Sequence, residues 1–189
     1  MIAIINYNLS NLNCVLSAIN FCGYNAKITN DLKEIENANK IILPGVGAFP
    51  DAMLNLKKLN LINILNEKVL NLKTPVLGIC LGAQLICNMS NEFGLNKGLG
   101  WIDFDVLKLS PKKRIFRVPH TGWNEIRIHN KKSVLLNQID EKDNLFYFNH
   151  SYFIQNKNDN GVTATSSHGK EFVAIIEKNN IFATQFHPE

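Results

Sequence analysis

Cys80 lies between two glycines, in the stretch Gly78–Gly82, and directly follows an apolar run. The spacing G-x-C-x-G is typical of a nucleophile on a sharp turn between a strand and a helix, where side chains at the flanking positions would collide. Such a turn would place the sulfur at the start of the helix, where free N–H groups and the helix dipole favour a thiolate. We therefore predict that Cys80 is a nucleophile and not a small core residue.

The remaining cysteines lack these flanking glycines and are expected on a helix face or in the core: Cys14, Cys22 and Cys87. The four cysteines form no C-x-x-C pair, and the chain begins without the basic leader of a secretory signal, so reduced thiols and a cytoplasmic location are expected. No stretch approaches the ~20 apolar residues that a membrane span needs, so no membrane association is expected.

A thiol nucleophile needs a base, and His187 is the strongest candidate among the five histidines. It follows the apolar run Ile181–Phe186 and stands two residues before Glu189. Residues two apart in an extended segment face the same way, so the Glu189 carboxylate can hold one imidazole nitrogen while the other faces the thiol. A triad of Cys80, His187 and Glu189 is therefore predicted, provided that the two strands run parallel and end at the same sheet edge. The alternatives are a histidine that merely ends a strand, or a metal site; no third ligand stands at a diagnostic spacing, so no metal is expected.

The loop Pro44–Phe49 carries two glycines directly after the apolar run Ile41–Leu43. It could cradle a phosphate, but it lacks both G-x-G-x-x-G and the lysine of a P-loop, so neither a nucleotide nor another cofactor is expected. A backbone N–H near Gly47 could instead join that of Leu81 in an oxyanion hole. Two donors, a thiolate, an imidazole and a carboxylate predict acyl transfer by a cysteine amidase or a related hydrolase.

Apolar runs and helical spacing alternate through the first half of the chain, which predicts a parallel sheet covered by helices. Ser10 is the expected cap of the first helix, and Gly23 its end. The expected strands are Ile2–Asn6, Ala26–Thr29, Ile41–Leu43 and Val76–Ile79; the expected helices run from Ser10 to Gly23, from Leu32 to Ala38, from Asp51 to Leu70 and from Leu81 to Met89.

From about Trp101 the pattern changes to short runs rich in β-branched and aromatic residues, which predict antiparallel strands that continue the same sheet. These runs are Phe104–Leu109, Ile115–Val118, Leu145–Phe148, Val162–Thr165, Phe172–Glu177 and Ile181–Phe186. No linker-like segment separates the halves. We therefore expect one α/β domain over residues 1–189: a flavodoxin-like central mixed sheet flanked by helices, with an antiparallel extension in the second half.

The net charge is only +4, and the one basic cluster is Lys112, Lys113 and Arg114 with Arg117. Because no aromatic residues alternate with these cations, a solvated turn is favoured over a nucleic-acid site.

The elbow Gly78–Gln84, together with the terminal Gln185–Glu189, resembles the triad (class I) glutamine amidotransferases. Within them, four further stretches resemble the glutaminase subunits of imidazole glycerol phosphate synthases: Pro44–Phe49, Gly98–Gly100, Val118–Asn124 and Asn149–Tyr152. The resemblance implies that Cys80 attacks the side-chain amide of glutamine to form a thioester, that His187 protonates the departing ammonia and then activates water, and that Glu189 orients His187.

The resemblance also implies a glutamine pocket formed by Gln84, His150, Ser151 and Tyr152, and an oxyanion strand around Val46 and Gly47 that acts with Leu81. It implies a heterodimer with a (β/α)8-barrel cyclase subunit, which receives ammonia for imidazole glycerol phosphate formation in histidine biosynthesis and sets the productive orientation of that strand. The expected partner-facing residues are Pro119, His120, Gly122, Trp123 and Asn124; taken alone, Trp123 could equally lie in the core.

The chain departs from the family pattern in three places. The segment Tyr7–Asn11 lacks the glycines usual after the first strand, and Thr121 replaces a usual methionine. Relatives also continue beyond the position of Glu189, so a closing helix is expected there.

Three other functions remain open. A paralogous glutaminase would supply ammonia for amidation of a surface-polysaccharide or nucleotide-linked sugar. A cysteine hydrolase acting on γ-glutamyl peptides would share the triad but not the segment 119–124. A non-catalytic flavodoxin-like binding module would carry Cys80 as a structural residue.

Overall fold

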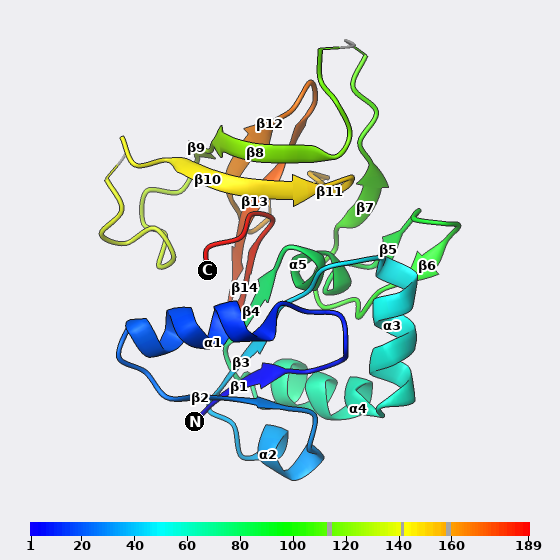
Figure 1. The fold of residues 1–189 in the computed structure, drawn as a ribbon, viewed down its shortest axis with the longest axis vertical. Helices are drawn as coiled ribbons and strands as arrows, with labels where there is room; N and C mark the ends of the chain where they lie inside the picture. The colour runs from blue at the N-terminus through cyan, green and yellow to red at the C-terminus, as the bar shows by residue number, and fades with distance from the viewer. Residues whose placement is uncertain (113–114, 141, 158–159) are drawn as a thin grey trace.

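The computed structural model describes residues 1–112, 115–140, 142–157 and 160–189; Lys113 and Arg114 of the basic cluster lie outside these ranges. Its central feature is an eight-stranded sheet in the order β2-β1-β3-β4-β14-β13-β12-β9 (Figure 1). The first four strands are parallel, as predicted. β14 also runs parallel to β4, as the predicted triad requires, although the run Ile181–Phe186 was expected among the antiparallel strands. Their bounds are Ile2–Ile5 (β1), Ala26–Thr29 (β2), Lys40–Leu43 (β3), Val76–Ile79 (β4) and Ile181–Thr184 (β14).

Helices cover both faces of the parallel strands because successive strand residues point to opposite sides. On one face Val15 of α1 packs against Ile4 and Ile79. On the other face Ala3 and Ile5 belong to the main core, which includes residues from the remaining helices. The helices are α1 (Leu12–Phe21), α2 (Leu32–Glu36), α3 (Phe49–Lys58), α4 (Leu61–Asn66), the π-helical segment η1 (Glu67–Asn71) and α5 (Leu81–Leu85). None of the helices in the described ranges is long and apolar enough to cross a membrane.

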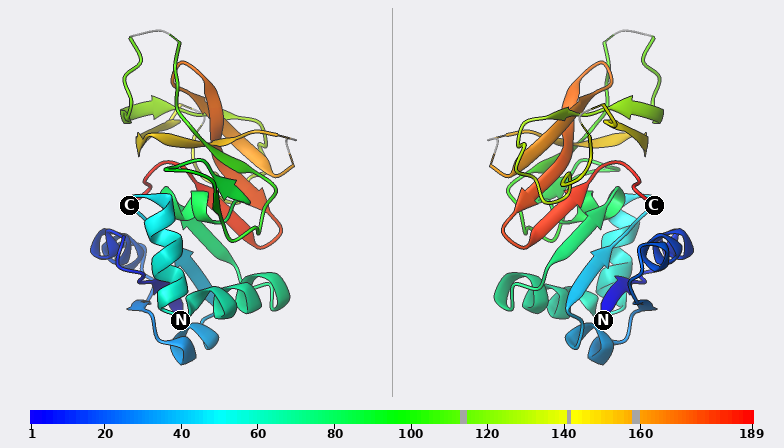
Figure 2. Two further views of the ribbon diagram at one scale, coloured as in Figure 1. Left: turned by 90° about the vertical axis from the view of Figure 1, so that its right-hand side faces the viewer. Right: turned by 90° about the vertical axis from the view of Figure 1, so that its left-hand side faces the viewer.

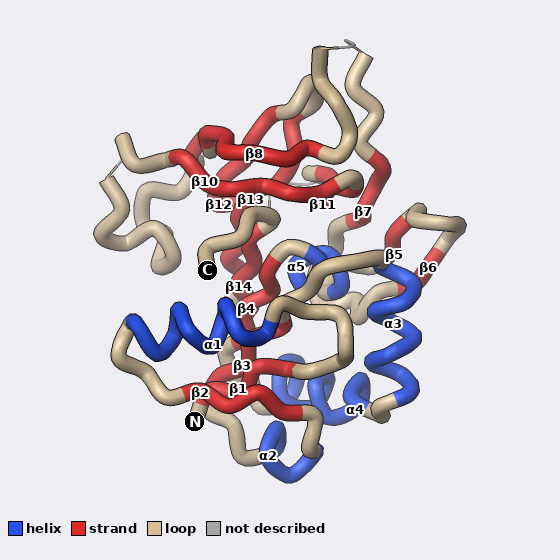
Figure 3. Tube along the Cα trace, viewed as in Figure 1, coloured by secondary structure: helices blue, strands red, loops and turns tan. Residues whose placement is uncertain are grey.

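The second half is built from strands, and Figure 3 shows that the upper part of the molecule contains no helix among the residues described. The antiparallel strands β13, β12 and β9 extend the main sheet beyond β14, as expected. Two smaller sheets, β10-β8 and β11-β7-β5-β6, stand apart from it. The bounds are Met89–Ser90 (β5), Asn96–Lys97 (β6), Asp105–Lys108 (β7), His120–Glu125 (β8), Arg127–Ile128 (β9), Leu145–His150 (β10), Tyr152–Gln155 (β11), Val162–Ser167 (β12) and Glu171–Lys178 (β13).

Three strand predictions are therefore wrong, two of them in part and one entirely. The runs Phe104–Leu109 and Leu145–Phe148 form strands, but in the smaller sheets and not in the main one. The run Ile115–Val118 forms no strand, and β8 begins only at His120. Pro119 stands at this boundary, and proline has no N–H to donate to a sheet ladder.

The helix predictions also need three corrections. The expected helix Asp51–Leu70 is interrupted at Asn60, whose left-handed backbone (φ 56°) an asparagine tolerates better than most residues. The helix after Cys80 ends at Leu85 and not at Met89. Ser10 does not cap α1; its hydroxyl donates to the Pro44 carbonyl at 3.1 Å.

Seen from the sides, the helix-covered parallel strands and the strand-rich half are stacked along the long axis of the molecule (Figure 2). β14 joins the two halves, because it pairs in parallel with β4 and antiparallel with β13. The C-terminal residues that follow β14 therefore leave the sheet at the same edge as the residues that follow β4.

Candidate active site

Cys80 occupies the turn between β4 and α5, which confirms the predicted strand-turn-helix setting. Its backbone is strained, with φ 51° and ψ −105°. Two backbone hydrogen bonds hold this conformation: the Cys80 N–H donates to the Thr184 carbonyl at 2.8 Å, and its carbonyl accepts from the Gln84 N–H at 3.2 Å.

The glycines beside Cys80 are required by close backbone approach. A Cβ on Gly82 would overlap the carbonyl oxygen of Leu43 at the end of β3, and a Cβ on Gly78 would lie 2.9 Å from the backbone of Ala83. The predicted steric reason for the glycine frame is therefore confirmed.

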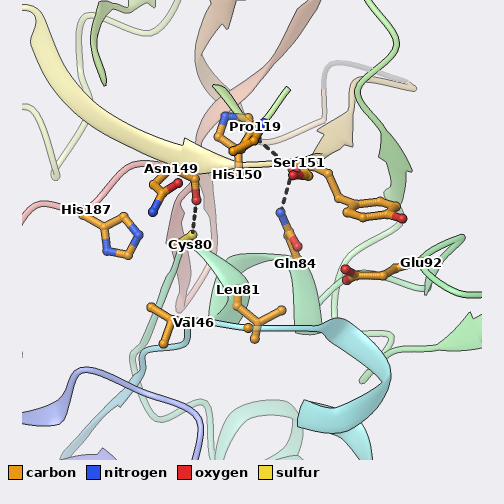
Figure 4. A pocket seen from close by; sticks show the side chains of 12 residues that line it. Val46, Cys80, Leu81, Gln84, Glu92, Pro119, Asn149, His150, Ser151 and His187 are labelled. Atoms are coloured by element: carbon orange, nitrogen blue, oxygen red, sulfur yellow. Dashed lines mark hydrogen bonds between the residues drawn. The ribbon is translucent and has the colours of Figure 1, made fainter. Parts of the chain in front are cut away.

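The structure brings His187 and Glu189 to Cys80 through the pairing of β14 with β4. Thr184 lies opposite Ile79 in this register, so the segment after β14 passes beside the elbow. Figure 4 shows the His187 ring turned toward Cys80. The imidazole Nδ1 lies 2.9 Å from Glu189 Oε1, and the two side chains are 15% and 9% exposed.

The surroundings of His187 favour the protonated form of its imidazole. Burial alone would lower its pKa, but interactions with Cys80 and Glu189 outweigh burial and raise the pKa to about 10. Burial opposes ionisation of Glu189 as well, yet the hydrogen bond from His187 keeps the pKa of this carboxyl below its usual value. The pair is therefore an imidazolium and a carboxylate at neutral pH.

A pocket of about 290 Å³ opens above Cys80 (Figure 4). The sequence-predicted residues that line it are Cys80, His187, Val46, Gly47, Leu81, Gln84, His150, Ser151, Tyr152 and Pro119. The sequence interpretation missed two further lining residues, Glu92 and Asn149. Within the described ranges, no group of three metal-ligating side chains is present.

Glu92 contributes a buried carboxylate to this pocket. It is 8% exposed, its Oε2 accepts a hydrogen bond from the Phe49 N–H at 2.8 Å, and burial raises its pKa. No sequence pattern points to it, because it lies in the turn between the two-residue strands β5 and β6.

The predicted pocket residue Gln84 uses its amide nitrogen within the protein. Its Nε2 donates to the Tyr152 carbonyl at 2.9 Å and to Gln185 Oε1 at 3.0 Å. Gln185 in turn lies beside Cys80, with Nε2 3.8 Å from the sulfur. Strand alternation could have indicated Gln185, because it stands two residues before His187.

Two buried histidines beside the pocket form a chain of hydrogen bonds in which each donor and acceptor can be assigned. His150 Nδ1 lies 2.8 Å from the Tyr152 carbonyl, which can only accept, so this nitrogen carries the proton. His150 Nε2 must then accept from His120 Nδ1 at 3.0 Å, and His120 Nε2 accepts from Asn124 Nδ2 at 3.2 Å. Burial lowers the pKa of His150 to about 3 and that of His120 to about 4, so both rings are neutral.

The prediction that His120 faces a partner is therefore wrong for its side chain. His120 is 4% exposed, and its ring stacks on Phe148 and His168. The two faces of β8 explain the error, since successive residues of a strand point to opposite sides and His120 points to the covered side. Trp123, on the opposite side of β8, is 71% exposed and contacts the Tyr147 ring edge-on, so it does not lie in the core.

Two of the three predicted oxyanion donors, Leu81 and Val46, are not open in this conformation. The Leu81 N–H donates to the Gly45 carbonyl at 3.3 Å, and the Val46 N–H donates to the Leu9 carbonyl at 2.9 Å. Gly47, which is exposed, has a positive φ of 105°. The backbone of this loop would have to rotate before the Leu81 N–H could bind an oxyanion.

The fold and the site define a class: the chain belongs to the class-I glutamine amidotransferases, whose family model matches residues 3–189. Among curated relatives, it is 43% identical to imidazole glycerol phosphate synthase subunit HisH 2 of Methanococcus maripaludis and 45% identical to subunit HisH 1 of Campylobacter jejuni strain RM1221. Subunit HisH 2 of Pseudomonas aeruginosa is 38% identical. Each match covers all of this chain and 92% of the relative. The predicted resemblance is confirmed.

Solved structures with the same fold are more distant in sequence. PurLQS from Thermotoga maritima superposes with a TM-score of 0.73 at 17% identity, over 99% of this chain and 86% of that one. A crystal structure of a glutamine amidotransferase gives 0.72 at 13% identity, over 98% and 89%. These likenesses confirm the predicted single-domain α/β fold.

Proposed function

We propose that this chain hydrolyses L-glutamine to glutamate and ammonia and passes the ammonia to a (β/α)8-barrel cyclase subunit, for imidazole glycerol phosphate formation in histidine biosynthesis. The observation that carries the proposal is the meeting of Cys80 and His187 at one pocket, with Glu189 bound to His187. The chain matches over its full length relatives named as subunits of that synthase. We place it in the cytoplasm as one half of a heterodimer.

The site supports a two-step mechanism. The Cys80 sulfur attacks the amide carbon of the glutamine side chain, and the His187 imidazolium gives its proton to the departing ammonia, which leaves a thioester. His187 then takes a proton from water, which attacks the thioester and releases glutamate and the thiolate. Glu189 holds the imidazole through Nδ1 throughout, as the acid of a triad does.

Glutamine recognition is assigned to the walls of the pocket. The buried Glu92 carboxylate is suited to the α-ammonium group, because a charge removed from water needs an opposite charge. Both N–H groups of the Gln84 amide are used within the protein, so its oxygen is a further candidate acceptor for the α-ammonium group. The backbone of Ser151 and Tyr152 remains the candidate for the α-carboxylate. A volume of about 290 Å³ accommodates a free amino acid.

The hydrogen bond from Leu81 N–H to the Gly45 carbonyl supports a dependence on the partner. With that donor occupied, the tetrahedral oxyanion lacks stabilisation that is worth about 3 kcal/mol per donor in comparable sites. The free chain should therefore hydrolyse glutamine slowly, and a docked barrel subunit that turns the loop Gly45–Gly47 should accelerate it. The exposed Trp123 and the neighbouring rim residue Pro119 are the proposed contacts with that subunit.

One observation favours a second acceptor for the ammonia. The relatives in Methanococcus maripaludis, Campylobacter jejuni and Pseudomonas aeruginosa carry numbered names, HisH 1 or HisH 2, which indicates more than one such subunit in those organisms. A paralogue could supply ammonia for amidation of a sugar. Genomic neighbours distinguish the two acceptors, since histidine-pathway genes favour the first and sugar-modifying genes the second.

The decisive experiment is Cys80→Ala in the complex with the barrel subunit. We expect loss of glutamine-dependent synthesis by at least a thousandfold, with synthesis from added ammonium salts retained, because only the source of ammonia is removed. The measurement is product formation from each nitrogen source, with and without the barrel subunit. Retained use of glutamine would refute the assignment of the nucleophile.

A further inference from the structure

Gln185 is a buried polar side chain that the mechanism above does not use. It follows β14, is 1% exposed, and lies between Gln84 and the Cys80 sulfur. A buried amide is costly unless its polar atoms are hydrogen-bonded, so both ends of this side chain need partners. One end has Gln84 Nε2 at 3.0 Å, and the other has the sulfur at 3.8 Å.

The partners fix which end of the Gln185 amide faces the sulfur. The Tyr152 carbonyl can only accept, so the Gln84 atom beside it must be the NH2 group. That same NH2 group can only donate to Gln185, so the Gln185 atom that it meets must be the oxygen. The NH2 group of Gln185 is thereby turned toward Cys80.

The sulfur needs such a donor when it is ionised. Cys80 is 6% exposed, so little water can solvate a thiolate there. The sulfur also lies 3.9 Å from the Asn149 carbonyl, which can accept from a thiol but repels a thiolate. The Gln185 N–H group therefore offsets a contact that turns unfavourable when the proton leaves.

We propose that Gln185 is a catalytic residue whose amide donates a hydrogen bond to the Cys80 sulfur and favours its ionised, nucleophilic form. The proposal deepens the proposed function and rests on Cys80 being its nucleophile. Gln84 is the positioning residue, because it prevents the Gln185 amide from turning its oxygen toward the sulfur.

The test compares Gln185→Met, which keeps the length of the side chain without a donor, with Gln185→Glu, which keeps the acceptor for Gln84 but presents an oxygen to the sulfur. Carbamidomethylation of the Cys80 peptide by iodoacetamide at pH 7 is followed by mass spectrometry, with exposed Cys14 as internal reference. Thr184→Val removes a buried hydroxyl that bonds the Phe186 carbonyl and does not touch the sulfur, so it controls for loosening of this strand end.

Both Gln185 variants should slow Cys80 alkylation about tenfold relative to Cys14, which is the effect of losing one hydrogen bond to a charged group. Thr184→Val should change it less than twofold. In the assembled enzyme, kcat for glutamine should fall by a similar factor with KM changed less than threefold. Unchanged alkylation in both variants, or slowing in Gln185→Met alone, would overturn the proposal. A wild-type complex without glutaminase activity, but with the slowed alkylation in both variants, would refute the proposed function and leave this inference standing.

Discussion

The elbow Gly78–Gly82 and the loop Pro44–Gly47 follow neighbouring parallel strands and meet at the same sheet edge, but packing constrains them differently. The elbow is closed, meaning that a Cβ on either of its flanking glycines would overlap or crowd backbone atoms. In the loop, Gly47 is exposed, and a Cβ there would meet only a Leu9 methyl group at 3.6 Å. The position of the nucleophile is thus set by the fold, whereas the loop backbone at Gly47 has room to turn.

The hydrogen bonds of these two segments differ in length, and the longest joins the elbow to the loop. The elbow is joined to β14 by a 2.8 Å bond from the Cys80 N–H. The bond between the two segments, from Leu81 N–H to the Gly45 carbonyl, is 3.3 Å long. Weaker, longer bonds are the ones that break first, so a rearrangement that frees the Leu81 N–H would begin at this bond.

The largest effect is expected for Gly82→Ala in the elbow. Its new methyl group would overlap the Leu43 carbonyl, and backbone on both sides cannot relax, so the free energy of unfolding should fall by about 3 kcal/mol or more. Urea unfolding followed by circular dichroism measures the change. A variant with wild-type stability and activity would show that the elbow is not closed, and the contrast with the loop would be lost.

A smaller effect is expected from acid, which tests whether the elbow is also held through the histidine chain that ends at the Tyr152 carbonyl. The folded chain keeps His150 neutral down to about pH 3 and His120 down to about pH 4, whereas unfolded histidines take up protons below about pH 6.5. The unfolded state therefore binds more protons in this window, and stability falls as the pH falls. The slope is up to about 1.4 kcal/mol per pH unit for each histidine, and it vanishes above pH 6.5.

The raised pKa of His187 does not disturb this test, because its contribution to stability changes only between about pH 6.5 and 10. His150→Asn keeps a donor for the Tyr152 carbonyl but does not titrate, so its stability should fall less steeply between pH 6.5 and 4.5. Exposed His129→Asn is the matched control and should keep the wild-type slope. Equal slopes for all three proteins would separate the elbow from the histidine chain.

The parallel half of the fold could be predicted because each strand and helix there has its own local signal. The apolar runs before Gly45 and Gly78 predicted two strands, and the glycine spacing predicted the turn after the second. The antiparallel half could be predicted only as strands. Which strand pairs with which depends on contacts between distant segments, and β8 carries Gly122 and few apolar residues, so it has no clear alternation.

The site also has one part that local sequence patterns predict and one part that depends on contacts between distant segments. The expectation that Cys80 and His187 meet needed only local spacing and parallel strands. Glu92 reaches the pocket through the tertiary position of a short turn, which no local pattern encodes. The burial of His120 and the exposure of Trp123 follow from the two faces of one strand, and their assignment required knowing which face is covered.

The smallest effect on stability, and the sharpest test of the contrast, is expected for Gly47→Ala in the loop. The new methyl group has space, but a φ of 105° disfavours any side chain, so the free energy of unfolding should fall by only about 1 kcal/mol. The glutaminase activity stimulated by the barrel subunit should fall at least tenfold, because the added Cβ limits the backbone rotation that would free the Leu81 N–H.

Gly94→Ala separates this effect from backbone strain alone. Gly94 has nearly the same φ, 111°, and a Cβ there meets nothing within 4 Å, so the variant should lose similar stability while its stimulated activity stays within twofold of wild type. Thermal unfolding and glutamine turnover with the barrel subunit are measured on both variants. If Gly47→Ala were fully stimulated, the loop would not need to rotate, and the Leu81 N–H would have to be freed by movement of the elbow, which the closed packing around Gly82 opposes.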